Sequence, residues 1–207
     1  MNKKVFLIST VFWMMTWLWE PIIFNEGNKI SHIGDYLICR GVLLFFIYGC
    51  CNFLWNLCIK KRSQEKQIAL FALPYIIILA MFWRILGIYP LAGDELWIFQ
   101  NAQNFDPTRF FTCYTGYFYI ICMMLIPDMI SIVLVKSLLN AFVVGYLIYR
   151  VKKICDSRYI FLIYGVFCLW PVLQMATSVH RMPTYALLYI FIFTKLFADY
   201  CERKKQV

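Results

Sequence analysis

Asp94 and Glu95 are the residues of this 207-residue chain whose type and setting best suit chemistry. They follow Gly93, which permits a tight turn. The run behind them carries an apolar residue at every third position: Leu96, Phe99, Ala102 and Phe105. This pattern predicts an amphipathic helix along a membrane surface, where a partly desolvated carboxylate is a stronger general base. The alternative is that the two acids only keep a loop in water.

Four basic side chains are candidates for binding a negatively charged group. His180 and Arg181 occupy a turn between two apolar segments, Arg84 lies near the end of a third, and Arg109 follows the acidic pair. Each has a structural alternative. Arg84 can extend its charged end to the membrane interface, Arg109 can balance Asp106, and His180 can be an ordinary structural histidine.

The elements that must position these residues are helices in a lipid bilayer. Hydrophobic residues make up 62% of the chain and charged residues only 15%, whereas soluble chains carry about 25% charged residues. Lipid must therefore cover surface that polar side chains cover in a soluble protein, which excludes an ordinary soluble globular domain. The net charge of +9 then indicates basic loops on the cytoplasmic side rather than a nucleic-acid partner.

Apolar segments near the length of about 20 residues that a transmembrane helix requires recur along the chain. They are residues 5–24, 37–59, 68–89, 129–149, 159–177 and 184–198. The sequence thus predicts an all-α polytopic transmembrane helical bundle of about six spans. We expect one integral membrane domain over residues 1–207, with two N-terminal spans in 1–66 and the core spans, with an outer loop at 90–112, in 67–198.

Segment 113–127 decides the topology of everything after it. It is apolar but short, and Pro127 breaks it, so it is either a span or a juxtamembrane, re-entrant helix. The re-entrant alternative puts the basic segments between spans on the cytoplasmic side, as charge bias favours. We therefore predict a multi-pass plasma-membrane protein with both termini in the cytoplasm. Loop 90–112 and turn 178–183 then meet at the outer face.

The order of motifs from Arg84 onward resembles a known family. This arginine near the end of a span is followed, about ten residues later, by Asp94-Glu95 and an alanine-bearing amphipathic run. A short helix opened by Thr115-Gly116-Tyr117 then precedes a long span closed by basic residues. A later span carries Pro171 ahead of the basic turn. Over residues 84–198 this pattern resembles the GT-C glycosyltransferases, integral membrane enzymes that take sugars from polyprenyl-linked donors.

The resemblance implies a site. Asp94 would be the general base toward the acceptor hydroxyl, with Glu95 assisting. Cations would stabilise the growing charge of the departing lipid phosphate. The implied substrate-binding residues are His180, Arg181, Arg84, Arg109 and Tyr117. No cofactor is expected, and a divalent metal is not favoured, because the basic turn carries no second acid.

Two functions remain open from the sequence. The first is a membrane glycosyltransferase, or a short or truncated remnant of one, that transfers a sugar from a polyprenyl-phosphate donor to an acceptor hydroxyl at the outer membrane face. The second is a non-catalytic membrane subunit of a polysaccharide synthesis or export complex. The expected partners are the polyprenyl-linked donor, the bilayer and a membrane protein supplying missing spans. A transporter is less suited, because few polar residues interrupt the spans.

Further ionisable residues have structural interpretations. Glu20, Asp35 and Arg40 are predicted to lie at the membrane interface. Lys136 lies inside a predicted span, where a cation must face a cavity or a partner. Asp128, two turns earlier on the same helix face, is the local candidate for that partner.

Overall fold

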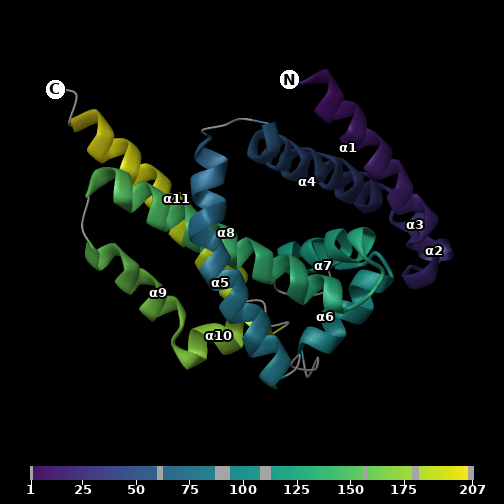
Figure 1. Ribbon diagram of the computed structural model, residues 1–207. Coiled ribbons are helices and arrows are strands. Elements are labelled where there is room, and N and C mark those ends of the chain that lie inside the picture. The colour runs from purple at the N-terminus through teal and green to yellow at the C-terminus, as the bar shows by residue number, and fades with distance from the viewer. Residues whose placement is uncertain are drawn as a thin grey trace. The chain divides into compact units, whose positions relative to one another are not determined.

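The computed structural model describes residues 2–59, 63–86, 94–107, 113–155, 158–178 and 182–204 (Figure 1). Within those ranges the chain forms helices joined by turns, and no strand occurs. The all-α prediction is therefore confirmed for the described residues.

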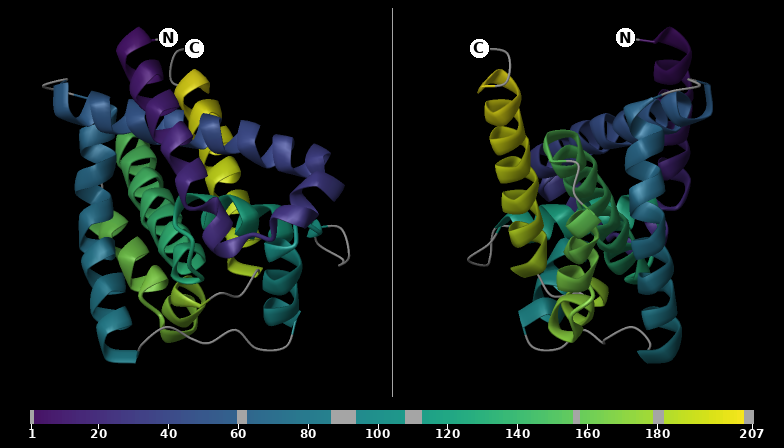
Figure 2. Two further views of the ribbon diagram at one scale, coloured as in Figure 1. Left: turned by 90° about the vertical axis from the view of Figure 1, so that its right-hand side faces the viewer. Right: turned by 60° about the vertical axis from the view of Figure 1, so that its left-hand side comes forward.

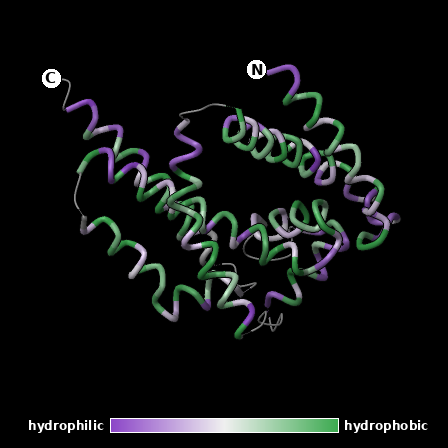
Figure 3. The backbone as a smooth tube through the Cα atoms, in the orientation of Figure 1, coloured by the Kyte–Doolittle hydropathy of each residue, from purple (hydrophilic) through white to green (hydrophobic). Residues whose placement is uncertain are grey.

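Four helical stretches are long and apolar enough to cross a membrane. The first, Lys3–Ile23, comprises α1 (Lys3–Met15), η1 (Thr16–Leu18) and α2 (Glu20–Ile23). The others are α4 (Ile33–Ile59), α5 (Gln64–Leu86) and α8 (Ile130–Ile154). Figure 3 colours these helices mostly hydrophobic, with hydrophilic residues gathered toward helix ends. They coincide with the first four predicted spans.

A fifth crossing depends on a bent pair of helices. The stretch Tyr159–Phe167, which ends in α9 (Leu162–Phe167), meets α10 (Trp170–Thr177) at a bend of 60°. Together they have the length and composition of one broken span. The last predicted span falls in α11 (Met182–Lys204), which carries several charged residues and is not among the qualifying helices. The described chain thus has four or five candidate spans, and about six is not confirmed.

The short apolar helix α7 (Cys113–Leu125) has 13 residues. At 1.5 Å per residue it is about 20 Å long, whereas the hydrocarbon core is about 30 Å thick. Its length therefore favours a juxtamembrane or re-entrant helix over a complete span.

The chain divides into two compact units that are interleaved in sequence. The first unit comprises residues 1–61 and 91–132, and the second comprises residues 62–90 and 133–207. The first therefore contains α1 to α4, of which α3 is the short helix Glu26–Ser31, and also α6 (Asp94–Gln103) and α7. The second contains α5, most of α8, and the helices that follow it.

An antiparallel pair of helices, α1 and α4, forms one side of the first unit. The ring of Phe6 lies 6.4 Å from that of Tyr48, and the indole N–H of Trp13 donates to the carbonyl oxygen of Arg40 at 2.9 Å. Helix α7 is joined to this pair because the indole N–H of Trp19 donates to the carbonyl oxygen of Met124 at 2.9 Å. We call α1 to α4 the N-terminal hairpin.

Contacts in the second unit fix the directions of its helices. Helices α9 and α10 run parallel to α5, because residues pair in the same order along both: Phe71 with Tyr164, Tyr75 with Phe167, and Phe82 with Trp170. Helix α8 runs the opposite way, since residues near its start contact the end of α10 at Ala176 and Ser178. Buried apolar side chains from α5, α8, α9 and α10 form the core between them.

Helix α11 runs parallel to α8 in the second unit, as both views of Figure 2 show. The rings of Tyr146 and Phe191 lie 4.8 Å apart. Further along, Arg150 Nη2 lies 2.5 Å from Asp199 Oδ1, and Lys153 Nζ lies 3.0 Å from Glu202 Oε1. The last turns of α8 and α11, both basic, therefore lie at the same end of the unit.

Gly145 allows α8 to approach α5 closely. A Cβ atom added there would lie 2.5 Å from the carbonyl oxygen of Ile68 and 2.9 Å from the Cβ of Ala72. Replacing Gly145 with alanine should therefore destabilise the fold by about 1–3 kcal/mol, because the helices must separate. Thermal unfolding in detergent measures the effect. Gly165→Ala is the matched control, since nothing lies within 4 Å of its added Cβ; equal unfolding temperatures for both variants would contradict the close packing.

Candidate functional site

Asp94 and Glu95 form the first turn of α6. Asp94 is exposed and Glu95 is half-buried. Negative side chains at this end of a helix are stabilised by the unpaired backbone N–H groups and the helix dipole. The candidate base therefore lies on an ordered helix end rather than on an extended loop.

The buried face of α6 differs from the predicted apolar stripe. Ile98 and Ala102, together with Phe105 just beyond the helix, are buried, whereas Leu96 is 42% exposed. These buried positions are four and then three residues apart, as the 3.6-residue period of a helix requires. A strict three-residue step drifts around the helix, so of the predicted stripe Ala102 and Phe105 are buried, Phe99 is half-buried and Leu96 is exposed. Contact of this helix with a membrane surface stays a prediction.

The far end of α6 is closed by an unusual residue, Phe105. Its backbone φ is +54°, and its N–H donates to the carbonyl oxygen of Ala102 at 3.1 Å. The N–H of Asp106 donates to the carbonyl oxygen of Asn101 at 3.0 Å. These two bonds make a Schellman cap, in which glycine commonly takes the left-handed position. A bulky residue there costs about 1–3 kcal/mol, which surrounding contacts must offset.

The tyrosine predicted to bind substrate contacts the N-terminal hairpin. The hydroxyl of Tyr117 donates to Asp35 Oδ1 at 2.5 Å, and His32 Nδ1 lies 3.8 Å from Asp35 Oδ2. Asp35 thus joins the start of α4 to α7.

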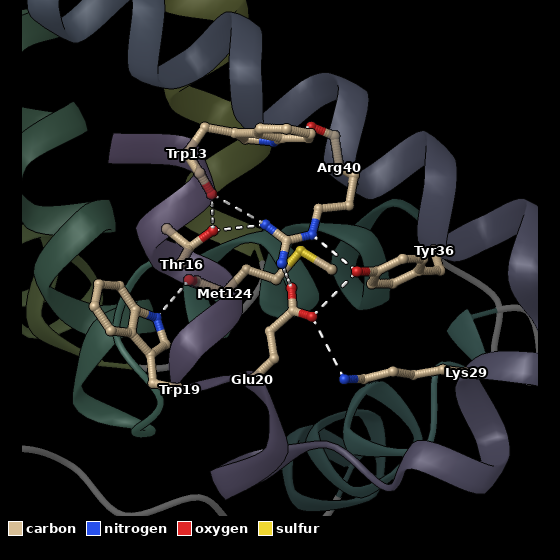
Figure 4. Close-up of polar contacts among 8 residues, drawn as sticks. All are labelled: Trp13, Thr16, Trp19, Glu20, Lys29, Tyr36, Arg40 and Met124. Carbon is tan, nitrogen blue, oxygen red and sulfur yellow. Dashed lines mark hydrogen bonds and ion pairs between the residues drawn. The ribbon is translucent and has the colours of Figure 1, made fainter. Parts of the chain in front are cut away.

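Glu20 and Arg40 form an ion pair inside the first unit, as Figure 4 shows. They are only 2% and 3% exposed, so both lie inside the protein rather than on its surface, and their place at the membrane interface stays a prediction. Arg40 Nη1 donates to Thr16 Oγ1 at 2.6 Å, and its Nε donates to the hydroxyl of Tyr36 at 3.2 Å. Lys29 Nζ lies 3.4 Å from Glu20 Oε2. We call these five residues the buried charge cluster.

The cluster was detectable in principle from the sequence. Glu20 and Arg40 are ionisable residues of opposite sign, each within or beside an apolar run. Such residues in membrane segments are expensive to bury and usually have a partner. Packing α1 against α4 brings this pair together, and the sequence alone does not give that register.

Lys136, in α8 of the second unit, is 1% exposed, and its side chain contacts the end of α10. Its ammonium donates to the carbonyl oxygen of Ser178 at 2.7 Å, and the neighbouring Ser137 hydroxyl donates to that of Ala176 at 3.3 Å. The predicted partner, Asp128, instead accepts the N–H of Ile130 at 2.7 Å. That prediction was wrong because an aspartate just ahead of a helix bonds to the helix start rather than lying on its side.

The other candidate cations are less fully placed. Arg84 is exposed in the last turn of α5, in the second unit. His180, Arg181 and Arg109 lie outside the described residues. Asp94, Glu95 and Tyr117 belong to the first unit. Across the described part of the chain, no three His, Cys, Asp or Glu side chains gather to hold a metal ion.

The chain matches no protein-family model, no curated protein and no solved structure.

Proposed function

We propose that this chain is a GT-C-like membrane glycosyltransferase, or a shortened relative of one, that uses a polyprenyl-phosphate sugar at the outer membrane face. The observation that supports the proposal most is the placing of the acidic pair. Asp94 is exposed at the first turn of α6, while the opposite end of that helix is buried at Ala102 and Phe105. A carboxylate on an anchored helix has the reach and the fixed position that a general base needs.

The proposed reaction forms one bond and breaks one. The acceptor hydroxyl oxygen bonds to the anomeric carbon, and its proton passes to the Asp94 carboxylate, with Glu95 assisting. The bond from that carbon to the phosphate oxygen breaks, and the lipid phosphate leaves with the electron pair. Arg84, Arg109, His180 and Arg181 are proposed to stabilise the phosphate charge. Tyr117 is proposed to line the substrate site from α7.

The contact of Lys136 with the end of α10 supports the proposal that the donor phosphate binds near this end of α10. The bond from its ammonium fixes Ser178, the residue directly before segment 179–181, against α8. The negative end of the α10 dipole at Ser178 is thereby neutralised by a buried cation. An anion approaching this end of α10 would therefore meet less repulsion.

The proposed topology has six spans, both termini in the cytoplasm, and the plasma membrane as the location. It requires α11 to cross in addition to the candidate spans. The parallel course of α8 and α11 supports this, because their basic last turns lie together at one end of the second unit. Basic ends are retained on the cytoplasmic side.

Single-cysteine labelling tests this topology on a cysteine-free background. Cys155, exposed just after α8, should react with a membrane-impermeant maleimide only after the membrane is opened. A cysteine replacing exposed Gln100 on α6 should react in intact cells. Labelling of Cys155 in intact cells would place the end of α8 outside and would refute the proposed topology.

A transfer assay tests the activity. Purified protein in liposomes should release polyprenyl monophosphate from a panel of polyprenyl-phosphate sugars and glycosylate an acceptor, above the rate of protein-free liposomes.

The non-catalytic subunit is the second candidate, and the buried charge cluster favours it in one respect. The charges of Glu20 and Arg40 are used to join helices, so they provide no chemistry. Absence of release with every donor would favour that alternative.

A further inference from the structure

Phe105 combines a left-handed backbone with complete burial. Its φ is +54° and its side chain is 0% exposed. Its ring lies 4.4 Å from the ring of Phe24 and 5.5 Å from the ring of Tyr36, both in the N-terminal hairpin. A phenylalanine tolerates this conformation only when its surroundings hold it there.

Two polar contacts flank the buried ring. The side-chain amide of Asn28 donates to Asn104 Oδ1 at 2.9 Å, and the backbone N–H of Asn25 donates to the carbonyl oxygen of Gln103 at 3.5 Å. The last turn of α6 therefore touches the hairpin through both its ring and its backbone. Asn25 also caps α3, since its side chain accepts the N–H of Gly27 at 3.1 Å.

The hairpin wall that receives Phe105 is itself fixed by the buried charge cluster. The hydroxyl of Tyr36 donates to Glu20 Oε2 at 3.2 Å and accepts the Nε–H of Arg40 at 3.2 Å. The ring of Tyr36 cannot rotate away without losing both bonds. A buried ion pair thus holds an aromatic ring, and that ring holds the end of α6.

We propose that Phe105 is a positioning residue, through which the N-terminal hairpin fixes the acidic end of α6. A helix of ten residues is about 15 Å long and rigid, so securing its last turn sets the location of Asp94 at its first. The role of Asp94 rests on the proposed glycosyltransferase function, whereas the attachment of α6 to the hairpin does not.

The test separates this role from ordinary apolar packing. Phe105→Gly removes the ring but suits the left-handed backbone, so the Schellman cap of α6 is retained. Leu96→Ala is the matched control, because it removes an apolar side chain from the same helix at a site that is 42% exposed. Both variants should insert and fold.

Spin labels report the attachment directly. On a cysteine-free background, labels at exposed positions 33 and 100 lie on α4 and α6. Their distance distribution should be narrow in the parent and in Leu96→Ala, and broad in Phe105→Gly. An equally narrow distribution in Phe105→Gly would overturn the proposal.

Sugar transfer then tests positioning. In Phe105→Gly, kcat should fall about a hundredfold with the donor KM unchanged, because a base displaced by about 1 Å is that costly. A broad distance distribution with unchanged kcat would overturn the positioning role. If the parent protein transfers no sugar, the glycosyltransferase proposal fails, and the distance distributions alone decide whether Phe105 fixes α6.

Discussion

Asparagine at position 94 should abolish sugar transfer while the protein still inserts, folds and binds its donor. The amide keeps the shape of the carboxylate and still suits the first turn of α6, but it does not take up the proton of the acceptor hydroxyl. Loss of a general base typically lowers the rate by a factor of about 10²–10⁴. The measurement is kcat for polyprenyl-phosphate release in liposomes, with donor binding measured separately.

Glu26→Gln is the matched control for Asp94→Asn. Glu26 is also an exposed acid in the first turn of a helix of the first unit, α3, so its loss changes the net charge equally. Transfer should continue unchanged in this variant. If Asp94→Asn also transfers sugar at the parent rate, Asp94 is not the base and the accessory-subunit alternative gains support.

Methionine at position 40 should destabilise the protein more than any surface substitution. It leaves the carboxylate of Glu20 buried, with Lys29 at 3.4 Å as its remaining cation. Breaking a buried ion pair from one side costs about 3–5 kcal/mol. Denaturant or thermal unfolding in detergent measures the loss, and Arg203→Met, at an exposed arginine of α11, should show almost none.

A double variant distinguishes the lost ion pair from lost packing. In Glu20→Met with Arg40→Met, no charge is left unpaired, and replacing a buried pair by apolar residues is often neutral or stabilising. The double variant should therefore regain most of the stability that Arg40→Met loses. If the double variant is as unstable as Arg40→Met, the lost stability comes from packing around the guanidinium rather than from the unpaired carboxylate of Glu20.

Long apolar runs were enough to predict most of the helices that could cross a membrane. The helices through residues 3–23, 33–59, 64–86 and 130–154 all follow from length and apolarity, because each must satisfy its backbone within itself. The helix over 182–204 is less apolar because its last turns carry charged residues, and it is not among the helices that qualify as spans. The pairing of these charges with the end of α8 could not be predicted, because it depends on tertiary packing.

The candidate site was predictable where the signal was local. Gly93 and the acidic pair correctly indicated the start of a helix at Asp94. The prediction that Asp128 is the partner of Lys136 was wrong. Lys136 instead donates to the carbonyl oxygen of Ser178, which is 42 residues away in the sequence and comes close only because α10 packs on α8. The left-handed Phe105 was not predictable, since its conformation depends on Phe24 and Tyr36.

The interleaving of the two units has a consequence for the order of events during synthesis. Trp19 bonds to Met124, 105 residues later in the chain. At about 5–20 residues per second, roughly 5–20 s pass between their emergence from the ribosome. Glu20 and Arg40 can pair early in that interval, whereas the place for Phe105 between two hairpin rings stays empty until α6 is made. The N-terminal hairpin is therefore synthesised before α5, whereas α6 and α7, the helices that complete its unit, are synthesised after α5.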